Sequence, residues 1–387
     1  MGILSNTVSV CQYQVLGEVP ADDFFAWSGE CLAANAFHPI EQTSEELSVG
    51  WVHLADPKEQ DFSSDQVFRR DHYLIFSLRR DQRRVPAALM RAHLEQAQND
   101  FLAAHPGLQR VGKQKKEELR EAVRGALLAR TLPIPAVYDA VWDTRNNLLT
   151  FTSLSPKVTE LFEGLFKQTF TGLRLVALHP MARAAQVIPE ALRPALQQAN
   201  RATTEAVLEQ IQQNAWLGSD FLRWLLYQTL ESPSTYQVNQ PGPAAGGEPF
   251  VATLNDRLVL LGGAEGGLQK ITVAGPQDHF GEVRAALQHD KQIIEANLTM
   301  EKQENTWKMT FKAGLFHFAG YKAPAVKLEK DAITDADSEK EALFYERMFV
   351  LEEGLQLFDS LLATFLERRL GDWAVIEKDI SEWLEQA

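Results

Sequence analysis

Alternating apolar and polar side chains predict several strands in the first part of the chain. Residues 7–16 alternate and are rich in β-branched side chains, and residues 47–54 and 72–78 also have strand-like patterns. Between the first two strands, the apolar side chains of residues 24–32 recur at helical spacing after Pro20, which suits the first turn of a helix. The order strand, helix, strand, strand indicates an α+β fold.

From Ala87 the apolar period changes from that of strands to that of helices. One helix is predicted from Ala87 to the turn His105-Pro-Gly, and a second helix begins near Gln114. Two helices joined by a short Pro-Gly loop form an antiparallel hairpin, and we expect their apolar faces to meet. The apolar positions are Leu89, Met90, Leu94, Ala97, Phe101 and Leu102 on one helix, and Leu119, Val123 and Leu127 on the other.

The remaining residues predict more sheet and a helical C-terminal end. Hairpin turns are expected at residues 144–147 and 303–305, and a long amphipathic helix from Ser338 carries Phe349 on its apolar stripe. We therefore divide the chain into a first α+β domain (1–86 and 137–180), an inserted helical-hairpin finger (87–136), a helical connector and loop (181–249), a second α+β domain (250–335) and acidic C-terminal helices (336–387).

Composition narrows the class of protein. An apolar fraction of 45% and a charged fraction of 23% are typical of a folded chain. The chain has no run of about 18 apolar residues and no signal-peptide pattern, so we expect a cytoplasmic protein without a membrane partner. Two isolated cysteines, Cys11 and Cys31, exclude a disulfide scaffold and a CxxC zinc site.

Positive charge is concentrated in one part of the chain. Residues 69–130 contain 14 Lys or Arg and 7 Asp or Glu, a local charge of +7 within a net charge of −14. Such asymmetry favours contact with a polyanion, nucleic acid first. Four bases of the second helix lie on a stripe apart from its apolar face, namely Lys113, Lys116, Arg120 and Arg124. Two alternatives stay open: the bases solubilise an exposed hairpin, or they dock an acidic protein partner.

Motifs for catalysis are absent from the sequence. It contains no GxSxG, HExxH or GxGxxG, and its nine histidines have no partner at metal-ligand spacing, so no metal or cofactor is expected. A metal-dependent nuclease is the enzymatic alternative, because Asp278, Glu282 and Glu295 near Lys291 loosely approximate a carboxylate cluster. Charged residues scattered over a helix and the next strand are more often solvated.

Nine segments, in sequence order, resemble the RdgC family of bacterial recombination-associated DNA-binding proteins. They are AFHP (36–39), VGWVHL (49–54), HYLIFSLRRDQRRVP (72–86), GKQKKEELREAVRGALLARTL (112–132), VWDTRNNLLTFTS (141–153), LRLVALHP (173–180), FLRWLL (221–226), AALQHDKQIIEANL (285–298) and FYERMFVLEEGLQLFDSLL (344–362).

The resemblance implies a homodimeric ring around double-stranded DNA, without catalytic activity, that limits access of the RecA recombinase and associates with the nucleoid. This sequence departs from the family pattern in two ways. It has Leu132 where the family has an aromatic residue at the finger tip, and it has extra residues at 181–218 and at the C-terminus. The implied DNA contacts are Lys113, Lys115, Lys116, Arg120 and Arg130 on the finger and Lys291 in the second domain; the charge pattern adds Arg110 and Arg124.

Overall fold

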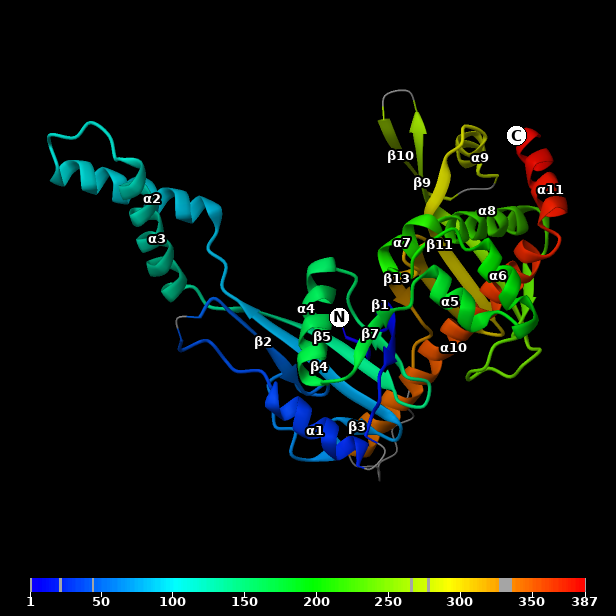
Figure 1. The fold of residues 1–387 in the computed structure, drawn as a ribbon, viewed down its shortest axis with the longest axis horizontal. Coiled ribbons are helices and arrows are strands. Elements are labelled where there is room, and N and C mark those ends of the chain that lie inside the picture. The colour runs from blue at the N-terminus through cyan, green and yellow to red at the C-terminus, as the bar shows by residue number, and fades with distance from the viewer. Residues whose placement is uncertain are drawn as a thin grey trace. The chain divides into compact units, whose positions relative to one another are not determined.

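A computed structural model describes residues 2–20, 23–43, 45–264, 267–276, 279–326 and 336–386 (Figure 1). Antiparallel strands and helices make up these residues, which confirms the predicted α+β class. No helix in the described ranges is both long and apolar enough to cross a membrane. The chain divides into two compact units, the first comprising Met1–Gly17, Trp142–Leu161 and Arg174–Ala387, and the second Glu18–Val141 and Phe162–Leu173.

The sheet of the first unit combines strands from both ends of the chain. The N-terminal strand is β1 (Thr7–Leu16), as the sequence predicted, and its first half pairs with β13. Tyr13 and Gln14 pair with both β6 and β7, which therefore lie on opposite edges of β1. The strand order is β10 (Gly267–Ala274), β9 (Pro249–Ala264), β11 (Gln292–Lys302), β12 (Asn305–Lys312), β13 (His317–Lys322), β1 and β6 (Leu148–Phe151), with β7 (Arg174–Ala177) on β1 and β8 (Thr235–Gln237) on β9.

Helices of the first unit confirm the helical character predicted for residues 181–218. They are α5 (Pro180–Val187), a 3-10 turn (Glu190–Leu192), α6 (Arg193–Ala199), α7 (Val207–Gln213), α8 (Trp216–Glu231), α9 (Gly281–Gln288), α10 (Ala336–Leu370) and α11 (Trp373–Glu385). The prediction that Phe349 lies on the apolar stripe of α10 is wrong, because its side chain is 48% exposed. The neighbouring Met348 is buried instead, and a helix turns by about 100° per residue, which carries Phe349 away from the sheet.

The helix α10 packs closely against the sheet of its unit at a glycine. Trp307 Nε1 donates a hydrogen bond to the Val350 carbonyl (2.7 Å), and Tyr321 Oη donates to the Leu351 carbonyl (2.9 Å). A Cβ atom on Gly354 would lie 2.1 Å from Tyr321 Oη and 2.4 Å from Trp307 Cδ1. A larger residue is therefore excluded at Gly354 by the two aromatic side chains.

The second unit has a smaller sheet with an aromatic core. Its strands are β2 (Leu47–Val52), β3 (Arg69–Arg70), β4 (Tyr73–Gln82) and β5 (Ile134–Asp143), in the order β5-β4-β2 with β3 on β4, and its sheet is accompanied by α1 (Phe24–Ala34) and the end of α4 (Pro156–Thr169). Trp51 meets Phe76 and Phe162 edge-on, with ring centroids 4.9 and 5.9 Å away, and its Nε1 donates to Thr169 Oγ1 (2.7 Å). The sheet that carries the two helices between β4 and β5 therefore has an aromatic core.

Candidate nucleic-acid interface

Two helices project from the sheet of the second unit. The helix α2 (Ala87–Ala104) follows β4, and α3 (Lys113–Arg130) leads into β5. Figure 1 shows this hairpin extending away from the strands that carry it. The His105 amide donates to the Leu102 carbonyl (3.1 Å), and the Leu108 amide donates to the His105 carbonyl (2.9 Å). The hairpin, called the finger below, therefore forms with the turn that the sequence predicted.

The apolar faces of the finger meet but bury little surface. Leu94 and Phe101 of α2 and Leu119 of α3 are half-buried, and Leu127 is the one buried side chain among the residues described in the two helices. A pair of helices without a third layer shields only the face that the two helices share. The finger therefore depends on its base for much of its stability.

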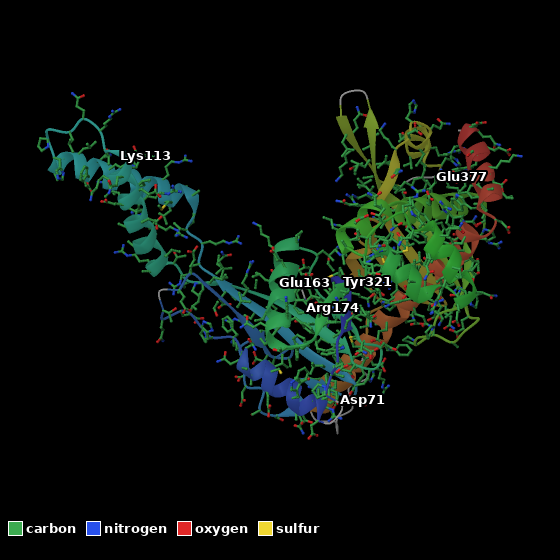
Figure 2. The ribbon with its side chains drawn as sticks, in the orientation of Figure 1. Asp71, Lys113, Glu163, Arg174, Tyr321 and Glu377 are labelled. Atoms are coloured by element: carbon green, nitrogen blue, oxygen red, sulfur yellow. The ribbon has the colours of Figure 1, made fainter. Side chains whose placement is uncertain are left out.

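Four of the predicted DNA contacts are exposed cations for which the described part of the chain offers no ionic partner. Among the residues that the structure describes, Arg110, Lys113, Lys116 and Arg130 form no ion pair, and all four are exposed. Figure 2 shows Lys113 on the finger, at the start of α3. Because no carboxylate of the described residues pairs with them, these side chains present their positive charge to an anionic ligand.

Two further predicted contacts are partly neutralised within α3. Lys115 Nζ lies 2.9 Å from Glu118 Oε2 and 5.6 Å from the centroid of the Phe101 ring, so the lysine side chain extends toward α2. Arg120 Nη1 lies 3.8 Å from Glu117 Oε1, and both side chains are more than half exposed. Exposed pairs of this kind contribute little energy, so Arg120 remains available to a competing anion at small cost.

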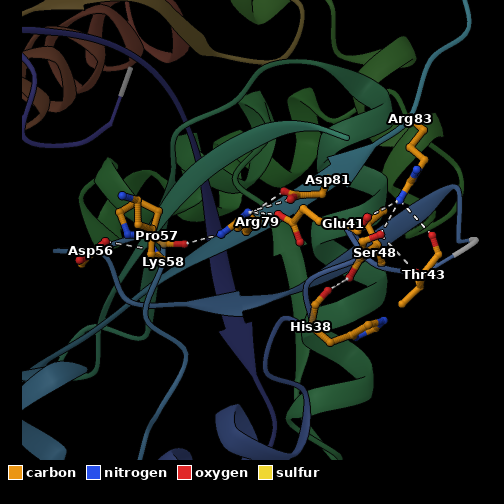
Figure 3. A network of polar contacts seen from close by, with 11 residues as sticks. His38, Glu41, Thr43, Ser48, Asp56, Pro57, Lys58, Arg79, Asp81 and Arg83 are labelled. Carbon is orange, nitrogen blue, oxygen red and sulfur yellow. Dashed lines mark hydrogen bonds and ion pairs between the residues drawn. The ribbon is translucent and has the colours of Figure 1, made fainter. Parts of the chain in front are cut away.

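The root of the finger is held by an arginine that the sequence analysis counted only as charge. Arg83, just after β4, is 3% exposed, and its two terminal nitrogens donate to five backbone carbonyls. Figure 3 shows Arg83 with two of these partners, Glu41 and Thr43. A sequence pattern shows side chains and not the carbonyls around them, so no signal marked this residue. Its acceptors are Leu128 (3.0 Å), Thr131 (2.9 Å), Ile40 (2.6 Å), Glu41 (3.2 Å) and Thr43 (3.0 Å).

The position expected for Leu132 is corrected by the structure. The far end of the finger is the turn at residues 105–112, between the two helices. Leu132 lies two residues after the end of α3 and two before β5, which places it at the root, beside the Thr131 carbonyl that Arg83 binds. Its side chain is 76% exposed. The finger-tip place of Leu132 was implied by the family resemblance, and the Pro-Gly turn predicted after His105 is where the projection ends.

The predicted contact Lys291 belongs to the first unit. It lies between α9 and β11, where its amide donates to the Ala286 carbonyl (3.2 Å). A Cβ atom on Gly262 of β9 would lie 2.9 Å from Lys291 Cγ, so the glycine leaves room for the lysine stem to cross that strand. Lys291 therefore has a defined path over the sheet.

The carboxylates of the nuclease alternative do not form a described cluster. Glu282 lies in the first turn of α9, and Glu295 on β11 pairs with Arg257 at 3.3 Å. Asp278 lies outside the described residues. Within the ranges that are described, no group of three or more His, Cys, Asp or Glu side chains is placed to hold a metal ion.

A comparison with protein-family models matches the first half of the chain. The family model described as "Putative exonuclease, RdgC" matches residues 25–215, a range that includes both helices of the finger and Arg83. A search of curated proteins found no match. The matched range ends before α8, so Lys291 and the C-terminal helices lie beyond it.

Proposed function

The chain belongs to the RdgC family, a family associated with recombination, and on this premise we propose that it binds double-stranded DNA irrespective of sequence. The observation that carries the proposal is the set of exposed cations on the finger that have no ionic partner among the described residues: Arg110, Lys113, Lys116 and Arg130. Phosphates are the ligands for which such a set is suited, and phosphate contacts carry no sequence information.

Charge elsewhere in the chain supports the same proposal. Outside residues 69–130 the chain sums to −21, since the total is −14 and this segment contributes +7. An acidic surface repels duplex DNA, so binding concentrates at the finger and at Lys291. Association then proceeds by release of counterions from DNA and weakens steeply as salt is added.

We further propose that two copies of the chain form a ring around the duplex and restrict the access of the RecA recombinase to it. A symmetric dimer presents two fingers to one duplex, which doubles the number of phosphate contacts without any new residue. The resemblance in nine segments supports this arrangement. Association with the nucleoid follows from sequence-independent binding.

The proposed binding is not catalytic. The family description names an exonuclease, and an exonuclease of the metal-dependent kind needs carboxylates that hold a divalent cation near the phosphate. The nuclease alternative therefore predicts loss of DNA in the presence of Mg²⁺, whereas the binding proposal predicts intact DNA after incubation. These opposite outcomes make one experiment decisive.

Gel-shift titration of linear and circular duplex DNA at several salt concentrations tests the proposal. We expect binding that weakens steeply with salt, and the double charge reversal Lys116→Glu, Arg120→Glu should lower the slope of log K against log salt by about 1.8, or about 0.9 per lost phosphate contact. The matched control is Lys378→Glu, which reverses the charge of an exposed lysine on α11, outside the finger. No shift at low salt would overturn the proposal.

Two outcomes of the same experiment point elsewhere. Degradation of DNA with Mg²⁺ that disappears in the Glu282→Gln variant would identify a nuclease. Absence of DNA binding together with salt-sensitive capture of an acidic polypeptide such as polyglutamate would identify a protein-interaction module. The size of the complex, from sedimentation with and without DNA, checks the dimer.

A further inference from the structure

A buried arginine, Arg83, lies where the finger meets its sheet. The chain enters the finger after β4 and leaves it into β5, and Arg83 occupies the position just after β4. Its guanidinium is enclosed, with the side chain 3% exposed, yet none of its hydrogen-bond partners is a carboxylate. A buried cation is costly unless its donors are satisfied. The five carbonyls satisfy the two terminal nitrogens of Arg83, whereas its Nε has no hydrogen-bond partner among the described residues.

These acceptors come from two segments that are separate in the fold. Arg83 Nη1 donates to the carbonyls of Leu128 and Thr131, at the end of α3. Arg83 Nη2 donates to carbonyls of residues 40–43, in the segment that precedes β2. One planar group therefore ties the last turn of a finger helix to the body of the second unit.

The chemistry of this contact favours arginine over lysine. The last carbonyls of a helix have no partner within the helix and carry the negative end of its dipole, so a cation placed there is stabilised. A guanidinium presents its donors in a rigid fork that reaches both segments at once. A lysine ammonium is a compact point charge with three donors, and it satisfies one segment at the expense of the other.

We propose that Arg83 is a positioning residue that sets the direction in which the finger projects. By joining α3 to residues 40–43, it holds the finger as one body with its sheet, so that the free cations Lys113 and Lys116 are presented in one place. The consequence for DNA rests on the proposed function. The effect on the direction of the finger does not depend on DNA.

Distance measurement between two spin labels tests this directly in the full chain. The labels are placed at exposed positions of the second unit, Asn99→Cys on α2 and Ala55→Cys on its body, with Cys11→Ala and Cys31→Ala as background. The otherwise native chain should give one narrow distance distribution without DNA. A broad distribution there would overturn the proposal, whatever any variant of Arg83 does.

The variant Arg83→Lys keeps the charge and removes the fork. We expect the width of the distance distribution to grow at least about twofold, because the exposed Arg124–Glu46 pair, which still links α3 to the start of the sheet, contributes little energy. The matched control is Arg79→Lys on the same strand, since Arg79 binds Asp81 and the Pro57 carbonyl and no residue of the finger. An Arg83→Lys distribution as narrow as that of the control would overturn the proposal.

Duplex binding separates the two proposals. If the finger of Arg83→Lys points in the binding direction about one tenth of the time, affinity at fixed salt falls about tenfold. The salt slope should stay unchanged, because the same phosphates are contacted once DNA is bound. A tenfold loss with a reduced slope would make Arg83 a direct phosphate contact and overturn the positioning role. Failure of the otherwise native chain to bind DNA would refute the proposed function alone.

Discussion

The guanidinium of Arg124 lies 2.6 Å from the Glu46 carboxylate, so a base that its sequence position marks for DNA contact has a partner within the protein. The pair links α3 to the start of the second unit's sheet, close to the carbonyls that Arg83 binds. Both side chains remain almost half exposed, at 46% and 42%. Sequence charge alone therefore overstates how much of the basic stripe is free for a ligand.

This pairing predicts a difference between two single substitutions on α3. Arg124→Ala should lower duplex affinity less than Lys116→Ala, because Arg124 must give up Glu46 before it binds a phosphate. Lys116 has no such competitor among the described residues, so its loss should reduce the salt slope by about 0.9. Salt-dependent gel-shift titration of both variants measures the difference. Equal effects would show that the Arg124–Glu46 pair does not persist in solution.

A second prediction concerns the stability of the finger. Leu127→Ala should destabilise the finger by about 2 kcal/mol, because it removes the one buried side chain described in its two helices. Leu132→Ala, at a side chain that is 76% exposed, should change stability by less than about 0.5 kcal/mol. Hydrogen exchange of residues 87–131 reports the effect, and protection of β4 should be unchanged by either variant.

The contact between α10 and the sheet of the first unit gives a third prediction. Gly354→Ala should lower the free energy of unfolding by about 3 kcal/mol, since the new Cβ would overlap Tyr321 and Trp307. Gly164→Ala in α4 is the matched control, because no atom lies within 4 Å of a Cβ there. That control should stabilise the helix by up to about 1 kcal/mol. Urea denaturation compares the two variants, and equal midpoints would contradict the close packing.

A fourth prediction is a loss of stability in acid that depends on one histidine. Burial first, and the charge of Lys312 second, lower the pKa of His317 from 6.5 to about 4. The unfolded chain therefore binds a proton at His317 that the folded chain does not bind, so stability falls as the pH drops from about 6.5 toward 4. The loss should reach about 3 kcal/mol at the lower limit.

Urea denaturation between pH 4.5 and 7.5 measures this loss, and His317→Gln provides the comparison. The variant cannot take up the proton, so its stability should vary less with pH than that of the unaltered chain. Identical pH profiles would show that the imidazole is already accessible to solvent in the folded state.

Local patterns determined much of the fold before any tertiary contact was considered. The strand at residues 7–16, the turn that follows His105 and the helix near Gln114 each depend on neighbours within a few residues, and the structure has all of them. The α+β class follows from the same patterns. Local charge likewise marked the finger, because a cluster of bases is visible in sequence.

Only the tertiary structure decided which of these charges are free and what holds them in place. Glu46 lies 78 residues from Arg124, and the carbonyls of residues 40–43 lie about 40 residues from Arg83. Both contacts therefore form only in the folded second unit. The family resemblance, and not a local pattern, placed Leu132 at the finger tip, whereas the turn that the sequence predicts after His105 is the far end of the finger. Hydrogen bonds to backbone carbonyls and ion pairs between distant residues leave no local pattern in the sequence. Contacts of these two kinds hold the root of the finger.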